Sequence, residues 1–262
     1  MRPTRTLSEA NSRDAARKLS ASVFARHPSD IDLPTLCWLV GRLRIEEGEL
    51  NTADGRLVAS KSDGGYIRYR SGLSSEGRKR FIVAHELGHF CLHKMTGEID
   101  TAKDFMTYKK GNVESEANLF AAELLMPKDL VVPHFKGILP TLACLRGLSE
   151  EFTTSHIATI VQFIKYTYEP CAFVFSKEGE IQWFKMSGNF GHYLEAGAIR
   201  PFSAASDIFR GKAGDTNGFV DVSAGSWLRG YDLKGSESIK EDSYSWRSWD
   251  CVLTMLWIED EI

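Results

Sequence analysis

The sequence has few cysteines and no long apolar run, and each of these absences argues against a class of protein. The five cysteines are widely scattered and form no CxxC pair. They are Cys37, Cys91, Cys144, Cys171 and Cys251. An odd number of scattered cysteines argues against a disulfide framework. It predicts reduced and mostly buried thiols in a cytosolic protein.

Membrane spans, secretion signals and strong net charge are also missing. No apolar run approaches the length of a membrane-spanning helix, and residues 1–20 lack the apolar core of a secretion signal. We therefore expect a cytoplasmic protein with no membrane partner. The net charge of -3 argues against direct binding of nucleic acid. The 262 residues are enough for two modest domains, and their 43% hydrophobic content is that of an ordinary globular protein.

The spacing of apolar residues predicts an α+β protein in three parts. Residues 1–127 combine helices with a small antiparallel sheet formed by short alternating segments over 44–70. Residues 128–168 predict a helical segment that is interrupted at two prolines. Residues 169–262 predict strands, with a hairpin turn at 177–179 and a deeply buried final strand, CVLTMLWI. The chain contains no internal repeats.

One apolar run, FIVAHELGHFCLH at 81–93, contains three histidines and a glutamate. Its spacing predicts a helix that begins after Ser74 or Ser75. His85 and His89 are four residues apart, so both imidazoles lie on one helix face and can bind one Zn²⁺. Glu86 follows the first histidine directly and can take a proton from a water at the metal. The alternative is a pair of core histidines with separate hydrogen-bond partners.

Two further residues of this helix limit the interpretation. His93 lies eight residues beyond His85, about 12 Å along a straight helix, so one ion cannot bind both. We therefore interpret His93 as a helix-end residue or an outer partner of the ligands. Gly88 costs about 1 kcal/mol relative to alanine inside a helix. Close approach of another backbone beside the metal would explain this glycine.

A catalytic zinc needs a third protein ligand, and the downstream stretch VESEANLFAAELLMP contains the best donors. One side of this predicted helix is apolar, so the helix packs inward. A carboxylate near the start of such a helix needs a partner. Glu116 and Glu123 share a face and Glu114 lies on another. The residues alone place Glu116 only slightly ahead of the other two, and all three stay open.

The two stretches RFIVAHELGHFCLH and ESEANLFAAELLMP together resemble the ImmA/IrrE family of zinc metallopeptidases, and the resemblance extends over about residues 31–130. It implies a zincin-like domain with a gluzincin-like site and one Zn²⁺ per chain. In that site His85 and His89 would be metal ligands, Glu86 the general base and Glu116 the third ligand. The expected reaction is hydrolysis of a peptide bond. Tyr66, Tyr69 and Tyr108 are candidate donors to the oxyanion.

The resemblance also implies a role in bacterial stress responses or in the regulation of mobile elements. Members of the family cleave or relieve a helix-turn-helix transcriptional repressor, which here would be a separate chain. In one branch, a helix-turn-helix-like segment and a GAF-like sensor domain follow the peptidase, which would correspond to 128–168 and 169–262. A small-molecule signal could then act at the C-terminal domain. The alternatives are a non-catalytic regulator that sequesters a repressor, and a component of a toxin–antitoxin module.

Overall fold

The computed structural model divides the chain into two compact units, which we call unit 1 and unit 2. Unit 1 comprises residues 1–133 and 149–159, and unit 2 comprises 134–148 and 160–262. Both contain part of the segment 128–168, which the sequence analysis predicts as a separate helical part. The structure describes residues 7–22, 25–51, 53–60, 63–93, 97–102, 113–194, 196–246 and 250–259. No helix among these residues is long and apolar enough to cross a membrane.

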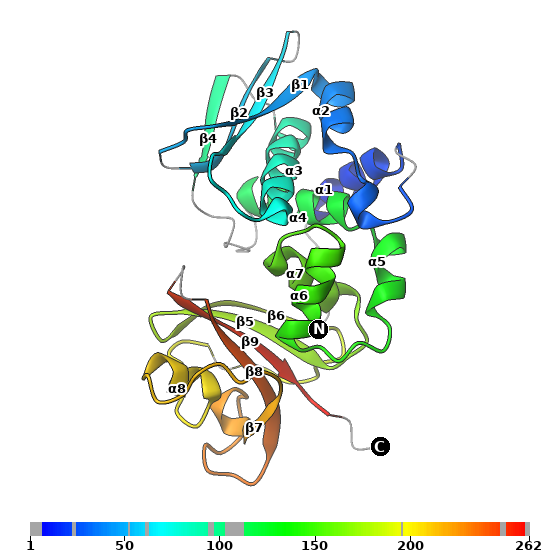
Figure 1. The fold of residues 1–262 in the computed structure, drawn as a ribbon. Coiled ribbons are helices and arrows are strands. Elements are labelled where there is room, and N and C mark those ends of the chain that lie inside the picture. The colour runs from blue at the N-terminus through cyan, green and yellow to red at the C-terminus, as the bar shows by residue number, and fades with distance from the viewer. Residues whose placement is uncertain are drawn as a thin grey trace. The chain divides into compact units, whose positions relative to one another are not determined.

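A four-stranded sheet forms one side of unit 1 (Figure 1). Its strands are β1 (Leu43–Gly48), β2 (Ala53–Ser60), β3 (Gly64–Arg70) and β4 (Gly97–Ala102), in the order β1-β3-β2-β4. β2 is antiparallel to both of its neighbours, but β1 runs parallel to β3. The predicted antiparallel sheet is therefore wrong in one pairing. Alternation shows which face of a strand is buried but not which strand lies beside it, and the link from β1 to β2 passes over β3.

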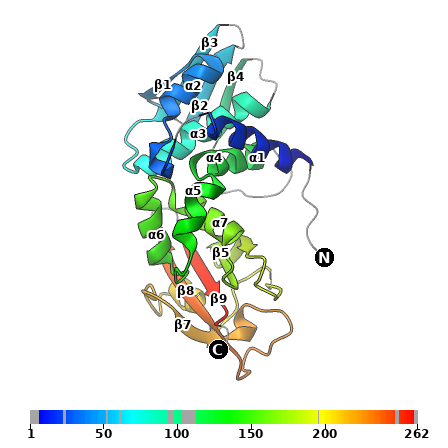
Figure 2. The same ribbon diagram turned by 90° about the vertical axis from the view of Figure 1, so that its right-hand side faces the viewer.

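The helices of unit 1 pack on this sheet and on one another. They are α1 (Leu7–Ser20), α2 (Leu33–Gly41), α3 (Glu76–Leu92) and α4 (Val113–Leu125). α3 lies against β2 and β3, and α4 packs between α3 and α1 (Figure 1; Figure 2). The predicted cap of α3 is confirmed, because the Ser75 side chain accepts a hydrogen bond from the backbone N–H of Arg78 at 3.2 Å.

Gly88 allows α3 and α4 to approach each other closely. A methyl group at this position would lie 3.0 Å from Cδ1 of Phe120 and 3.3 Å from Cα of Ala117, both on α4. Both of these α4 residues are completely buried. The close approach therefore explains why a glycine stands in the middle of a helix despite its cost.

Three helices lie in the segment 128–168, namely α5 (Lys128–Phe135), α6 (Leu142–Glu151) and α7 (His156–Tyr166). Unit 2 also contains a five-stranded sheet in the order β6-β5-β9-β8-β7, in which every pair is antiparallel. Its strands are β5 (Cys171–Lys177), β6 (Glu180–Met186), β7 (Val220–Ser223), β8 (Ser238–Trp246) and β9 (Cys251–Trp257). The short helix α8 (Ala204–Phe209) packs on β8 and β9. The structure confirms a mixed α+β fold but not the expected GAF-like domain.

The predicted hairpin of unit 2 joins β5 to β6 through two residues with positive φ, Glu178 at 54° and Gly179 at 75°. Two successive positive φ values are typical of a type I′ turn, whose twist matches that of the flanking strands. The central strand β9 is the predicted buried strand, and its residues from Cys251 to Leu256 are all buried. β4 and β8 were not predicted because their sequences are rich in polar residues, and α8 was not predicted because its six residues are too few to show a helical period.

Glu241 on β8 anchors the start of α8 in unit 2. Its side chain is completely buried and accepts four hydrogen bonds. The donors are the backbone N–H groups of Ala204 (3.1 Å) and Ala205 (2.7 Å), Nε1 of Trp227 (2.8 Å) and Oγ of Ser243 (2.7 Å). Both carboxylate oxygens are thus used as acceptors, and neither position can tolerate a donor.

Replacing Glu241 with glutamine is expected to destabilise the protein. One of the two terminal atoms becomes an NH₂ group that faces two donors, so the free energy of unfolding should fall by about 1–3 kcal/mol. Urea unfolding of the full chain measures the effect. Glu180→Gln, at an exposed position on β6, is the matched control and should change stability by less than about 0.5 kcal/mol. Equal effects of the two substitutions would contradict the anchoring role of Glu241.

Candidate metal centre

Three donor groups from α3 and α4 converge in unit 1. Nε2 of His85 and Nε2 of His89 lie 3.0 Å apart. The Glu114 carboxylate approaches both, with Oε2 3.2 Å from Nε2 of His85 and Oε1 3.4 Å from Nε2 of His89. All three ligand atoms lie within 4.8 Å of one another. The two histidines are almost fully buried, whereas the glutamate keeps 26% of its side chain exposed.

The sequence produces this convergence by simple means. The two histidines are one helical turn apart, so their rings lie on the same face of α3. Glu114 stands in the first turn of α4, which approaches α3 closely at Gly88. The helix start therefore brings a carboxylate to the two imidazoles.

Asn118 sets the orientation of the His85 ring. Nδ1 of His85 lies 2.9 Å from Oδ1 of Asn118 in a fully buried contact. The amide oxygen can only accept, so the imidazole proton is on Nδ1 and the lone pair of Nε2 faces His89 and Glu114. Burial lowers the pKa of His85, which favours the same neutral form.

The geometry and protonation of these groups fit a divalent metal. Burial raises the pKa of Glu114, but the neighbouring His85 and His89 outweigh this and lower the pKa overall, so the carboxylate is charged. A lone pair and a carboxylate that point at each other repel unless a cation lies between them. Ligands about 2.0–2.1 Å from a tetrahedral zinc are about 3.3–3.4 Å apart, close to the distances found here. A catalytic zinc also has three protein ligands and one open position.

Loss of the Asn118 contact is expected to weaken metal binding. Outer partners of metal-binding histidines typically contribute 10–100-fold to affinity, so Asn118→Ala should raise the Kd for zinc by about that factor. Asn118→Asp keeps an acceptor for Nδ1–H and should restore most of the affinity. Competition with a chromophoric chelator measures both values. Equal affinities in the alanine variant and the unmodified protein would contradict the role of Asn118.

The other two predicted candidates for the third ligand have different partners. Oε2 of Glu116 lies 3.9 Å from Nε2 of His93, at the C-terminal end of α3. Oε1 of Glu123 accepts a hydrogen bond from Nε of Arg17 on α1 at 3.0 Å. The geometry therefore favours Glu114 as third ligand over Glu116, which the sequence and the family resemblance place first.

Glu86, the predicted general base, is completely buried beside strand β2. A methyl group added at Gly55 would lie 2.5 Å from Oε1 of Glu86, so the carboxylate lies directly against the strand backbone. Sequence analysis did not single out Gly55. The Asp54-Gly55 pair looks like turn residues in the sequence, but in the structure both belong to β2.

Two of the three candidate oxyanion donors, Tyr66 and Tyr69, contact neighbouring side chains of the sheet. The Tyr69 hydroxyl lies 3.4 Å from Oε2 of Glu47, and the ring of Tyr66 lies under the guanidinium of Arg68. Tyr108 lies outside the described residues. The structure therefore gives a local partner to both tyrosines that it describes.

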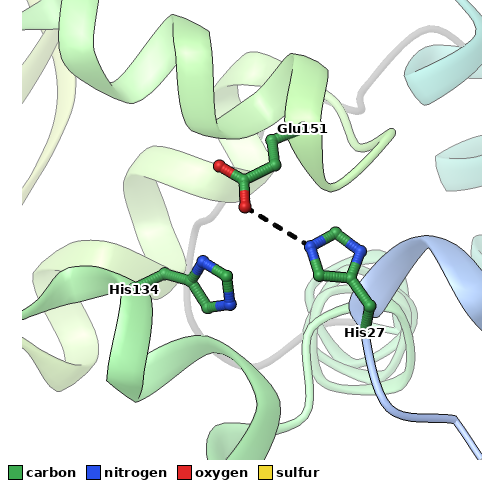
Figure 3. A group of neighbouring side chains, drawn as sticks. All are labelled: His27, His134 and Glu151. Atoms are coloured by element: carbon green, nitrogen blue, oxygen red, sulfur yellow. Dashed lines mark ion pairs between the residues drawn. The ribbon is translucent and has the colours of Figure 1, made fainter.

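Unit 1 contains a further contact between a histidine and a carboxylate, away from α3 and α4, which is drawn in Figure 3. Nε2 of His27 lies 3.5 Å from Oε1 of Glu151, and both side chains are partly exposed. His134, which the same figure labels, belongs to unit 2. A partly exposed ion pair of this kind contributes little to stability.

Fold and site together define a recognisable class. A helix with the pattern His-Glu-x-x-His on a small sheet, with a carboxylate from the next helix, is the arrangement of metallopeptidases. Residues 42–155 match the model of a peptidase family, described as IrrE N-terminal-like domain. Residues 42–155 are therefore similar to an IrrE N-terminal-like domain, in keeping with the resemblance of the sequence motifs to the ImmA/IrrE family.

Two relatives match the same part of the chain. Metallopeptidase ImmA of Bacillus subtilis (strain 168) is 29% identical over 103 residues, which are 37% of this chain and 58% of that protein. The uncharacterized immunity region protein 2 of Bacillus phage phi105 is 35% identical over 89 residues, 33% of this chain and 54% of that protein. The chain thus spans slightly more than half the length of these relatives.

A solved structure resembles nearly the whole chain. It is a Mycobacterium tuberculosis transcriptional regulator, with a TM-score of 0.58 and 14% sequence identity. The match covers 94% of this chain and 86% of that one. The similarity therefore extends beyond the IrrE-like domain, and at this identity it concerns the fold alone.

Proposed function

We propose that this protein is a zinc-dependent endopeptidase that cleaves a protein substrate. The observation that carries the proposal is the convergence of the ligand atoms of His85, His89 and Glu114, which lie within 4.8 Å of one another. The buried Glu86 follows His85 directly in the chain. A site that only stabilised the fold would need no general base. Similarity to a metallopeptidase over the same residues supports the proposal.

The proposed reaction divides the work between the ion and the side chains. Bound zinc would supply a Lewis acid that polarises the scissile carbonyl and lowers the pKa of water toward about 7. His85, His89 and Glu114 would hold the ion. Glu86 would take a proton from the attacking water as its oxygen adds to the carbonyl carbon. It would then pass that proton to the amine nitrogen as the C–N bond breaks, which leaves a carboxylic acid and an amine.

We further propose that the substrate is a helix-turn-helix repressor on a separate chain, as the family resemblance implies. The name of the phage relative, an immunity region protein, is in keeping with a role in mobile-element regulation. In this proposal residues 169–262 form a sensor domain that controls the peptidase.

The test uses the full-length protein with a defined metal content. The metal-free protein is loaded with one equivalent of zinc and incubated with a quenched-fluorescent peptide library and with repressors encoded near its gene. We expect zinc-dependent cleavage at discrete sites, its loss on addition of chelator and its return on addition of zinc. Binding of zinc without hydrolysis of any peptide or repressor would reject the peptidase.

A second candidate function is regulation by binding alone. It is favoured by the fold shared with a protein named as a transcriptional regulator, which extends over both units of the chain. In that case a repressor or another partner would be sequestered and not cut. Substitution of Glu86 separates the two functions, because only cleavage needs a base.

A further inference from the structure

One stretch of β2 contacts the same face of α3 that carries the proposed general base. Arg78, Ile82 and Glu86 are spaced by four residues, so they form one row along α3. The carboxylate of Asp54 pairs with the guanidinium of Arg78. A methyl group at Gly55 would lie 2.7 Å from Cγ2 of Ile82 and 2.5 Å from Oε1 of Glu86. Two adjacent strand residues therefore contact the whole row.

The strand is irregular at this point. The pairing of β2 with β4 shifts register between Ala53 and Gly55, as in a β-bulge. A bulge changes the direction of the strand locally and is common beside active sites. Here it brings the backbone of Gly55 against the carboxylate of Glu86, where any side chain would collide with it.

Asp54 fixes this bulge from two sides. Its Oδ1 lies 2.7 Å from Nη2 of Arg70 on β3, and its Oδ2 pairs with Arg78 in the first turn of α3. The Asp54 side chain is only 10% exposed, so its ion pairs are better shielded from solvent than ordinary surface pairs. One carboxylate thus ties the bulge to both the sheet and the helix.

We propose that Asp54 and Gly55 are positioning residues for Glu86, and this proposal rests on the proposed peptidase function. Because Gly55 has no side chain, the Glu86 carboxylate can lie against the backbone of β2. Asp54, through its pairs with Arg70 and Arg78, fixes the distance between β2 and α3 at this point. A general base must keep its carboxylate within hydrogen-bond reach of the attacking water. An error of about 1 Å in such a group can cost about 100-fold in rate.

The main test is a double-mutant cycle of Gly55→Ala with Glu86→Gln in the zinc-loaded full chain. Using the best-cleaved peptide of a quenched-fluorescent library, we expect Gly55→Ala alone to lower kcat about 100-fold with little change in KM or in zinc affinity. In the Glu86→Gln background the same substitution should have no further effect, because the group it displaces is already inactive. A loss of the same size in both backgrounds would overturn the proposal.

Two comparisons separate positioning from general damage to the fold. Gly48→Ala on β1 adds a methyl group whose three nearest atoms all belong to the flexible side chain of Arg68, and it should leave kcat unchanged. Asp54→Asn weakens the pairs with both arginines but fills no space. It should lower kcat by about 10-fold, again without changing KM, and it serves as the test if Gly55→Ala does not fold. An unchanged kcat in Asp54→Asn would exclude the anchoring role.

Crystal structures of the zinc-loaded protein and of the Gly55→Ala variant provide a result that does not depend on activity. We expect the Glu86 carboxylate to lie against Gly55 in the first structure and to be displaced in the second. If the unmodified protein cleaves nothing, the peptidase proposal fails, but these structures still decide the positioning proposal. An undisplaced carboxylate in the alanine variant would overturn it.

Discussion

Glu114→Ala is expected to abolish zinc binding, whereas Glu116→Ala should leave it intact. Glu114 approaches Nε2 of both histidines to within 3.4 Å, but Glu116 faces His93 at 3.9 Å. Loss of an outer partner already costs 10–100-fold in metal affinity, so loss of a direct ligand should cost more than about 100-fold. Peptidase activity should fall with the metal content. Zinc titration against a chromophoric chelator, together with circular dichroism, measures affinity and folding.

The two variants are closely matched controls for each other. Both positions are in the first turn of α4, and the two side chains are similarly exposed, at 26% and 22%. Neither truncation should therefore leave a large cavity or unfold the helix. The opposite result, with zinc lost only in Glu116→Ala, would restore the choice made from the sequence. Equal losses would show that the metal lies elsewhere.

The features that could be predicted from the sequence are those that depend on local geometry. The cap at Ser75, the helix that follows it and the placing of His85 and His89 on one face all follow from spacing within one helix. Gly88 was informative in the same way, because its cost required a close neighbour. That neighbour is the α4 backbone at Ala117, 3.3 Å from the position of the missing methyl group.

Which of the three glutamates is the third ligand depends on tertiary packing and not on spacing within one helix. Glu114 and Glu116 are separated by about 200° around a helix axis. Which one faces the histidines depends on how α4 is rotated against α3, and the contacts of Phe120 and Ala117 with Gly88 set that rotation. The sequence does contain a signal that favours Glu114. Glu114 and Asn118 are four residues apart, so a carboxylate and an amide oxygen share the face that meets His85.

The pairing of the strands likewise could not be predicted from spacing along the chain. Alternation predicted short strands over 44–70, but the parallel pairing of β1 with β3 depends on where the chain crosses. β4 was missed because its sequence is polar, although it pairs with β2 along its length. The bulge at Gly55 could not be seen either, since it exists only in the pairing of two strands that are far apart in the sequence.

Glu86→Gln is expected to lower kcat by about 10²–10⁴-fold while zinc affinity stays within a few-fold of the original. Glutamine has nearly the same shape and can still lie against Gly55, but it cannot accept the proton of the attacking water. Because Glu86 does not belong to the converging group of His85, His89 and Glu114, the metal should remain bound. Steady-state kinetics on the best-cleaved peptide and zinc titration measure the two quantities.

Glu76→Gln serves as the control, because this glutamate lies in the first turn of the same helix with 65% of its side chain exposed. It should change neither quantity. The decisive comparison is made in cells that carry the candidate repressor. If Glu86→Gln abolishes both cleavage and regulation, proteolysis is the activity. If regulation persists without cleavage, binding of the repressor is sufficient, and Glu114→Ala then shows whether that binding requires the metal.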